Sequence, residues 1–130
     1  MSGATLTIPN TETVTGRIDL QRSASTEYWL GHSGQDKGWK ADRPCRVTKF
    51  RAVGKVNSIS GSPASYVITL YKNSTSTTIA AITRTGTGTF NTDPSLSNAD
   101  IAVDDQLFVE CVLSGGNVGP VSFMIDLEYL

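Results

Sequence analysis

Alternation of apolar and polar residues at a period of two is the feature that most limits what this chain can fold into. In the segment 121–129 one side of an extended backbone carries Val121, Phe123, Ile125, Leu127 and Tyr129. The same spacing recurs over residues 107–113, where the side chains predicted to point inward are Leu107, Val109, Cys111 and Leu113. Successive side chains of a β-strand point to opposite faces, so both segments are predicted to be half-buried strands.

The other strands are predicted from shorter stretches of this pattern and from the turn residues between them. Thr, Ser and Gly account for 16, 14 and 12 of the 130 residues, a composition that favours strands and turns over helices. Residues 66–71 and 77–83 are predicted to form one hairpin, and residues 106–113 and 121–129 a C-terminal hairpin. A slip in the alternation at Lys49 and Phe50 predicts a β-bulge. The predicted fold is all-β, an antiparallel jelly roll or β-sandwich of about seven to nine strands.

A change of character near Pro44 divides the chain into two parts of a single domain. Residues 1–43 are polar, Gly-rich and weakly periodic, whereas residues 44–130 alternate. We interpret residues 1–43 as an N-terminal arm and loops, with weaker strands near 13–20 and 27–31, and residues 44–130 as the jelly-roll core. A chain of 130 residues fits one domain that buries roughly two thirds of its unfolded surface.

Charge is unevenly distributed along the chain. Residues 1–55 contain nine Lys and Arg against five Asp and Glu, whereas residues 56–130 contain two against seven. The dense basic stretch consists of Lys37, Lys40, Arg43, Arg46, Lys49, Arg51 and Lys55. Clustered cations can neutralise phosphates in nucleic acid, but a solvated face or a surface matched to an acidic protein is the more common reason for such a stretch. We therefore do not expect nucleic acid as a partner.

Catalytic and metal-binding chemistry lacks the residues that it needs. His32 is the single His, and no G-x-S-x-G elbow accompanies it. Asp104 and Asp105 are adjacent, so in a strand they would point to opposite faces, and a polar turn explains them better than a carboxylate pair or a Ca²⁺ site. Cys45 and Cys111 lack C-x-x-C spacing and are predicted to be reduced, buried thiols. We expect a protein that is not an enzyme, with no catalytic, cofactor-binding or metal-binding residues.

No membrane or export segment is expected either. The longest apolar run is four residues, Ile79 to Ile82, against the roughly 20 that a spanning helix requires. The N-terminus lacks a basic region followed by an apolar core, so no secretory signal is predicted and synthesis in a cytoplasm is the expectation.

Aromatic residues beside a Gly-rich loop are the candidates for contact with a partner. Tyr28, Trp29 and Trp39 flank the loop from Gly31 to Gly38. These rings could stack on sugars or anchor a neighbouring subunit, because aromatic side chains give a large contact area at low entropy cost; alternatively they close one end of the sandwich. Combined with the nearby cations, the candidate partner-contact residues are Trp29, Trp39, Lys37, Lys40 and Arg43.

Three segments carry a resemblance to a known group of domains. They are residues 66–73 (YVITLYKN), 101–107 (IAVDDQL) and 121–127 (VSFMIDL). In this order they resemble the C-terminal part of small jelly-roll domains in phage tail, head-fibre and capsid-decoration proteins, which are similar in fold to the C1q and tumour-necrosis-factor trimers. The resemblance covers about half of the chain, and Asp104–Asp105 stands where such domains usually have Gly-Asp.

This resemblance implies a homotrimer on a virion, made in the host cytoplasm and bound to the major capsid protein or another virion protein. The chain has no fused stalk or repeat, which favours a protein seated on a shell. The expected function is therefore that of a capsid cement or decoration protein. The alternative is a receptor-binding tail or head-fibre tip that recognises a host-surface glycan.

Overall fold

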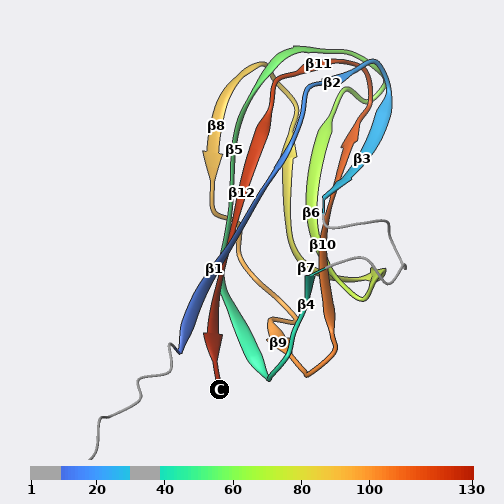
Figure 1. The fold of residues 1–130 in the computed structure, drawn as a ribbon. Helices are drawn as coiled ribbons and strands as arrows, with labels where there is room; N and C mark the ends of the chain where they lie inside the picture. The colour runs from blue at the N-terminus through green and yellow to red at the C-terminus, as the bar shows by residue number, and fades with distance from the viewer. Residues whose placement is uncertain (1–9, 30–38) are drawn as a thin grey trace, which may run out of the picture.

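The fold is an antiparallel β-sandwich, described here from a computed structural model for residues 10–29 and 39–130 (Figure 1). The strands of this part of the chain are β1 (Thr11–Ile18), β2 (Gln21–Arg22), β3 (Ser25–Trp29), β4 (Trp39–Lys40), β5 (Cys45–Ile59), β6 (Tyr66–Lys72), β7 (Ser74–Arg84), β8 (Gly88–Thr92), β9 (Asp100–Ile101), β10 (Gln106–Leu113), β11 (Gly116–Val118) and β12 (Val121–Tyr129). The predicted all-β class is confirmed. The strands outnumber the prediction because four of them are only two or three residues long, too short to produce an alternating pattern.

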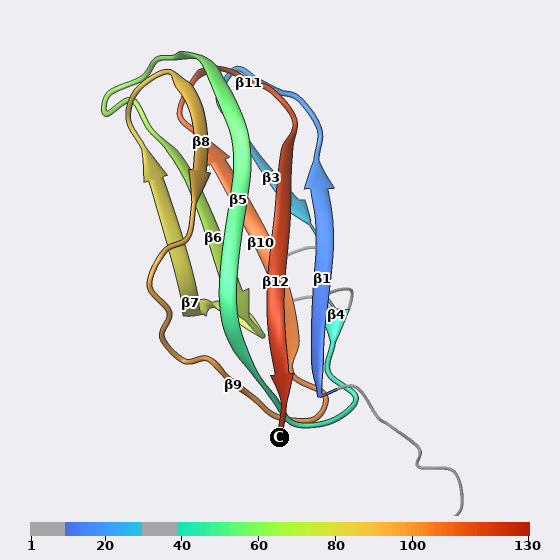
Figure 2. The ribbon, with the colours of Figure 1, turned by 90° about the vertical axis from the view of Figure 1, so that its left-hand side faces the viewer.

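Two sheets face each other. The seven-stranded sheet has the order β1-β12-β5-β11-β2, with β8 and β9 also paired to β5, and the five-stranded sheet has the order β3-β10-β6-β7, with β4 paired to β10. The longer strands form four nested antiparallel pairs, β1 with β12, β3 with β10, β5 with β8 and β6 with β7. Nested pairing of this kind, with first strand against last, is the winding of a jelly roll. Figure 2 shows the seven-stranded sheet in front of the other.

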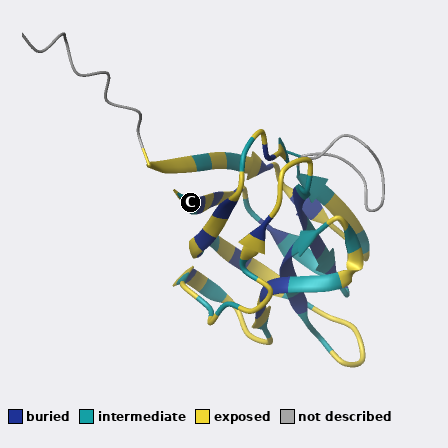
Figure 3. Ribbon diagram, turned by 90° about the horizontal axis from the view of Figure 1, so that it is seen from below, coloured by how far each residue is buried: buried dark blue, intermediate teal, exposed yellow. Residues whose placement is uncertain are grey.

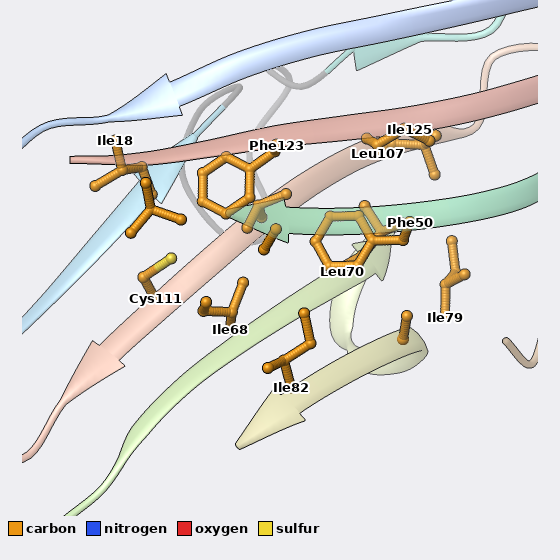
Figure 4. Packing of buried hydrophobic residues seen from close by; sticks show 14 of the residues in the cluster. Ile18, Phe50, Ile68, Leu70, Ile79, Ile82, Leu107, Cys111, Phe123 and Ile125 are labelled. Atoms are coloured by element: carbon orange, nitrogen blue, oxygen red, sulfur yellow. The ribbon is translucent and has the colours of Figure 1, made fainter. Parts of the chain in front are cut away.

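The core lies between the two sheets and follows the predicted alternation. Every second residue of β12 from Val121 to Leu127 is buried, and so is every second residue of β10 from Leu107 to Leu113. Figure 3 shows buried and exposed residues alternating along the strands, and Figure 4 shows Phe50 and Phe123 from one sheet facing Ile68 and Leu70 from the other. Burial of these apolar surfaces, at roughly 25 cal/mol per Å², is the main force that holds the sheets together.

The bulge and one hairpin were predicted correctly, whereas the C-terminal hairpin was not. In β5 the register against β12 shifts so that Thr48 is the extra residue, one position before the predicted slip. β6 and β7 form the predicted hairpin, with Asn73 at the turn in the left-handed region at φ 67°. The predicted pairing of residues 106–113 with 121–129 is wrong, because β10 and β12 belong to different sheets. The turn after β10 carries the chain across to β11, which pairs with β5.

The N-terminal segment also needs a correction. Residues 1–43 are interpreted above as an arm and loops with weaker strands near 13–20 and 27–31. Strands do form at these two places, as β1 and β3, but β1 is a full member of the seven-stranded sheet, in unbroken register with β12 over eight residues. Ile18 is buried in the core, and Val14 packs against it. The local pattern of this strand is weak because Thr residues fill its outer face and Gly16 occupies an inner position. Residues 1–9 lie outside the described part of the chain.

Candidate partner-binding surface

Trp29, one of the candidate contact residues, packs against the core. It lies opposite Val109 of β10, whose side chain is buried, so the indole faces the space between the sheets. The ring stacks on Phe123 with 5.6 Å between ring centroids. It also lies against Gly16 of β1, where an added Cβ would overlap the indole. Trp29 therefore closes the open side of the sandwich, between β1 of one sheet and β3 of the other.

Trp39 has a similar position one strand further along the chain. It lies opposite Leu107 of β10, which is fully buried, and its half-buried ring packs against the core. Both tryptophans thus occupy the packing role that was the alternative to partner contact. Their sequence positions beside the Gly-rich loop reflect the meeting of β3 and β4 along the same edge of β10.

Lys40 and Arg43 lie at one end of the sandwich, which we call the lower end. It comprises the start of β1, the end of β12, residues 39–44 and the turn 102–105, and Figure 1 shows it around the label C. Backbone hydrogen bonds join these segments, from Tyr129 N to Asn10 O, from Leu130 N to Pro44 O and from Asp104 N to Ala41 O. Lys37 lies outside the described residues.

Arg43 is held in a cluster that the sequence did not indicate. Its guanidinium carbon lies 3.7 Å from the centroid of the Tyr129 ring, close enough for a cation–π contact. The Tyr129 hydroxyl donates a hydrogen bond of 2.7 Å to Glu12 Oε1. This hydrogen bond, followed by burial, raises the pKa of Tyr129 to about 12. Glu12 and Tyr129 are at opposite ends of the sequence, so only the pairing of β1 with β12 brings them together.

The residues of this cluster line part of an open groove at the lower end. The groove has a volume of about 390 Å³ and is lined by Thr11, Glu12, Asp42, Arg43 and Tyr129. Val103, in the turn 102–105, and Leu130, which follows β12, are among the most exposed large apolar side chains of the described chain, at 48% and 68%. The lower end therefore offers charges of both signs together with two apolar side chains.

The basic first part and the acidic second part of the sequence do not form separate basic and acidic surfaces at β5. Arg46 of β5 donates to Asp100 at 2.8 Å, and Arg51 donates two hydrogen bonds to Asp93, at 2.7 and 3.0 Å. These hydrogen bonds to Arg51 lower the pKa of Asp93 to about 2. Lys49 also lies 3.5 Å from Asp93. Because acids from the second half of the chain face the cations of β5, this strand does not form a uniformly basic surface.

A second group of aromatic residues lies on the outer face of the five-stranded sheet. Phe108 is 2% exposed although its neighbours in β10 place it on the outer face. The rings of Tyr71 and Tyr28 flank it, with centroids 5.3 and 6.5 Å away. Tyr71 Oη lies 3.5 Å from Glu110 Oε1, and burial together with a hydrogen bond to Glu110 raises the pKa of Tyr28. The outward position of an apolar Phe108 was the only sequence signal for this patch.

The described residues that could suggest catalysis have structural roles. Asp105 accepts hydrogen bonds from the Ala102 N–H and from Asn73 Nδ2, which ties the turn before β10 to the β6–β7 turn. Cys45 and Cys111 are free and buried, as predicted. In residues 10–29 and 39–130 no three His, Cys, Asp or Glu side chains converge on a position where they could bind a metal ion. His32 lies outside the described residues.

Comparison with known proteins adds no family. No model of a known protein family matches this chain, and no curated protein matches its sequence. Within the described segments there is no helix of the length and apolar character needed to span a membrane.

Proposed function

We propose that this protein is a non-enzymatic structural protein of a phage virion, a capsid cement or decoration protein that binds the shell as a homotrimer. The observation that carries this proposal is the jelly-roll winding. The three segments that resemble phage jelly-roll domains fall on strands and turns of that winding, namely β6 with its turn, the turn into β10, and β12. Such a role needs surfaces and no chemistry, and its place would be the virion after synthesis in the host cytoplasm.

The lower end is the surface proposed to meet the shell. It combines Lys40 and Arg43 with the exposed Val103 and Leu130, and the chain segment 1–9 joins the sandwich there at Asn10. Charged groups around apolar side chains provide orientation and contact area together. A trimer would present this surface three times, so modest individual contacts would give stable occupancy through effective concentration.

The number of copies per particle tests this proposal most directly. We expect quantitative mass spectrometry of purified particles, with the major capsid protein as internal standard, to return a ratio comparable to that of the capsid protein. A ratio comparable to tail components would favour the receptor-binding alternative. Absence from the particle would refute both functions.

Variants of the lower end test the contact surface. We expect Lys40→Glu to weaken co-sedimentation with shells that lack the protein, because it reverses a charge at the proposed contact. The matched control is Lys55→Glu, an exposed lysine of β5 at the other end of the strand, near β8 and β11. Equal retention of the two variants on shells would argue against the lower end as the contact.

A glycan-binding tip remains the second candidate, with a different set of residues from the tryptophans. Tyr28 and Tyr71 flank Glu110 on the outer face of the five-stranded sheet, and aromatic rings beside a carboxylate suit stacking on sugar rings and hydrogen bonding to sugar hydroxyls. A glycan array would show binding that Tyr71→Ala abolishes. An array without hits would remove this candidate.

A further inference from the structure

β1 forms an edge of the seven-stranded sheet whose backbone groups can be assigned residue by residue. Tyr129 N donates to Asn10 O, directly opposite in register, so Asn10 belongs to a pair that exchanges hydrogen bonds. Because such pairs alternate along an antiparallel ladder, the N–H and C=O groups of even-numbered residues from Glu12 to Ile18 face β12. Those of the odd-numbered residues Thr11, Thr13, Thr15 and Arg17 face away from the sheet.

This outward-facing edge has no partner in the described part of the chain. β1 pairs with β12 alone, and Figure 2 shows it at the margin of its sheet. Its register has no bulge, and no proline interrupts it. An exposed edge strand with regular geometry is a template for pairing with another strand, and proteins usually protect such edges with bulges, charges or covering loops.

One edge of the other sheet, formed by β7, is protected in this way. The register between β6 and β7 shifts beside Leu70, and Ile79 lies in the resulting bulge. Ser97 N donates to Ile79 O, and the Asn98 side chain donates to Thr78 O, so a loop covers this part of β7. In contrast to β7, β1 is an edge that the described part of the chain leaves open for pairing.

The sequence just before β1 has the composition of a strand that could fill this edge. Residues 4–8 read Ala-Thr-Leu-Thr-Ile, in which Leu6 and Ile8 alternate with Thr5 and Thr7. This is the period of a half-buried strand. Nine residues precede Asn10, and an extended chain of this length reaches roughly 30 Å, enough to cross to a neighbouring molecule.

Pairing of this segment with β1 of its own chain is disfavoured by Pro9. Only Pro9 and Asn10 separate Ile8 from β1, and two-residue hairpins require type I′ or II′ turns with a positive φ at the first central residue. Proline fixes φ near −65° and cannot adopt that conformation.

We propose that residues 4–8 of one copy add as a strand to the open edge of β1 in a neighbouring copy, and that this arm exchange closes the trimer. The inference rests on the proposed homotrimer and names the contact that holds it together. Backbone hydrogen bonds to Thr11, Thr13 and Thr15 bind the incoming strand, as in other complexes formed by strand addition. Each copy gives one arm and accepts one, so the exchange closes as a ring.

Residue-resolved amide exchange by NMR tests the exchange directly. Even-numbered amides of β1 are protected by β12 in any case, whereas odd-numbered amides are protected only when a strand occupies the edge. We expect the amides of Thr11, Thr13 and Thr15 to exchange on the order of tenfold faster in a chain lacking residues 1–9, with the even-numbered amides unchanged. Fast exchange of the odd-numbered amides in the intact protein would overturn the proposal.

A proline variant removes one backbone N–H donor from the open edge of β1 and leaves residues 1–9 in place. Thr15→Pro deletes an N–H that faces the open edge, a position where a strand tolerates proline, and Thr15→Ala is the matched control that keeps the N–H. Light scattering at micromolar concentration is expected to return a trimer for the intact protein and for Thr15→Ala, and a monomer for Thr15→Pro and for the chain lacking residues 1–9.

The oligomeric states of these variants distinguish a failure of the arm exchange from a failure of the proposed trimer on which it rests. A trimer that persists in both Thr15→Pro and the shortened chain would overturn the arm exchange and leave the proposed trimer standing. An intact protein that is monomeric would overturn both, and protected odd-numbered amides in that monomer would mean that the arm folds back onto its own chain.

Discussion

The contact between Trp29 and Gly16 allows a test of whether the Trp29 side chain packs in the fold or is available to a partner. Trp29 lies so close to Gly16 that even a methyl group at that position would overlap the indole. We expect Gly16→Ala to be destabilising in the natural background and close to neutral, or stabilising, once Trp29→Ala has removed the ring. The double-mutant cycle is therefore expected to show strong coupling between two residues on strands of opposite sheets.

The magnitudes follow from the burial of each group. Full truncation of a buried Trp costs about 3 to 5 kcal/mol, so the half-buried Trp29 is expected to contribute about 2 to 3 kcal/mol to the free energy of unfolding. Gly16→Ala overpacks a filled site at a cost of about 1 to 3 kcal/mol. When Trp29→Ala has removed the ring, Gly16→Ala is expected to raise the free energy of unfolding by about 0.5 to 1 kcal/mol, because Ala is favoured over Gly in a strand. The coupling energy between the two substitutions therefore amounts to about 2 kcal/mol.

Chemical denaturation followed by circular dichroism measures these differences. In a domain of this size 2 kcal/mol corresponds to a Tm change of about 6 to 8 °C. Gly86→Ala is the matched control, because a Cβ at Gly86 meets no atom within 4 Å, and it should leave the stability nearly unchanged. If Gly16→Ala costs the same with and without Trp29, the indole does not cover β1 and Trp29 is available to a partner.

Three further predictions concern buried and charged groups. Tyr66→Phe should lower the free energy of unfolding by about 1 to 3 kcal/mol, because the buried Gln21 Oε1 loses the hydrogen bond that the Tyr66 hydroxyl donates at 2.8 Å; an unchanged denaturation midpoint would contradict this. Asp93 has a folded pKa of about 2, below the ordinary value, owing chiefly to its hydrogen bonds from Arg51, so its contribution to stability is complete above pH 4 and declines as pH falls toward 2. Tm profiles should therefore be flatter over this range in Asp93→Asn, and parallel profiles would refute the assignment. Burial raises the pKa of Cys111 to about 12, so iodoacetamide at pH 8 should label this thiol only after unfolding, as peptide mass spectrometry would show.

The inner faces of the long strands could be predicted because their signal is local. Alternation along residues 107–113 and 121–127 depends only on the two faces of each strand, and every predicted inward residue there is buried. Strand pairing depends on contacts between distant segments and has no such signal. Residues 106–113 and 121–129 were therefore paired with each other, whereas the short turn between β10 and β11 carries the chain to the opposite sheet.

The candidate site was harder to predict for a similar reason. An aromatic residue beside a Gly-rich loop has the same sequence signature whether it binds a partner or fills a gap at the edge of a core. What decides the matter for Trp29 is Gly16, a small residue on another sheet that makes room for the ring. The cluster of Arg43 with Tyr129 and Glu12 depends on the pairing of the first and last long strands, which no local pattern records.

The geometry of β1 explains how one strand can belong to the fold and still offer a contact. In this strand the residues with inward side chains, such as Val14 and Ile18, are the ones whose backbone groups face β12. The residues with outward side chains, such as Thr13 and Thr15, direct their backbone groups to the open edge. Stability therefore depends on the even-numbered positions of β1, and the proposed strand addition on the odd-numbered positions. Because two separate sets of residues carry the two roles, we expect Thr15→Pro to abolish the proposed assembly in a protein that remains folded, whereas substitution of Trp29 is expected to lower the stability of the fold.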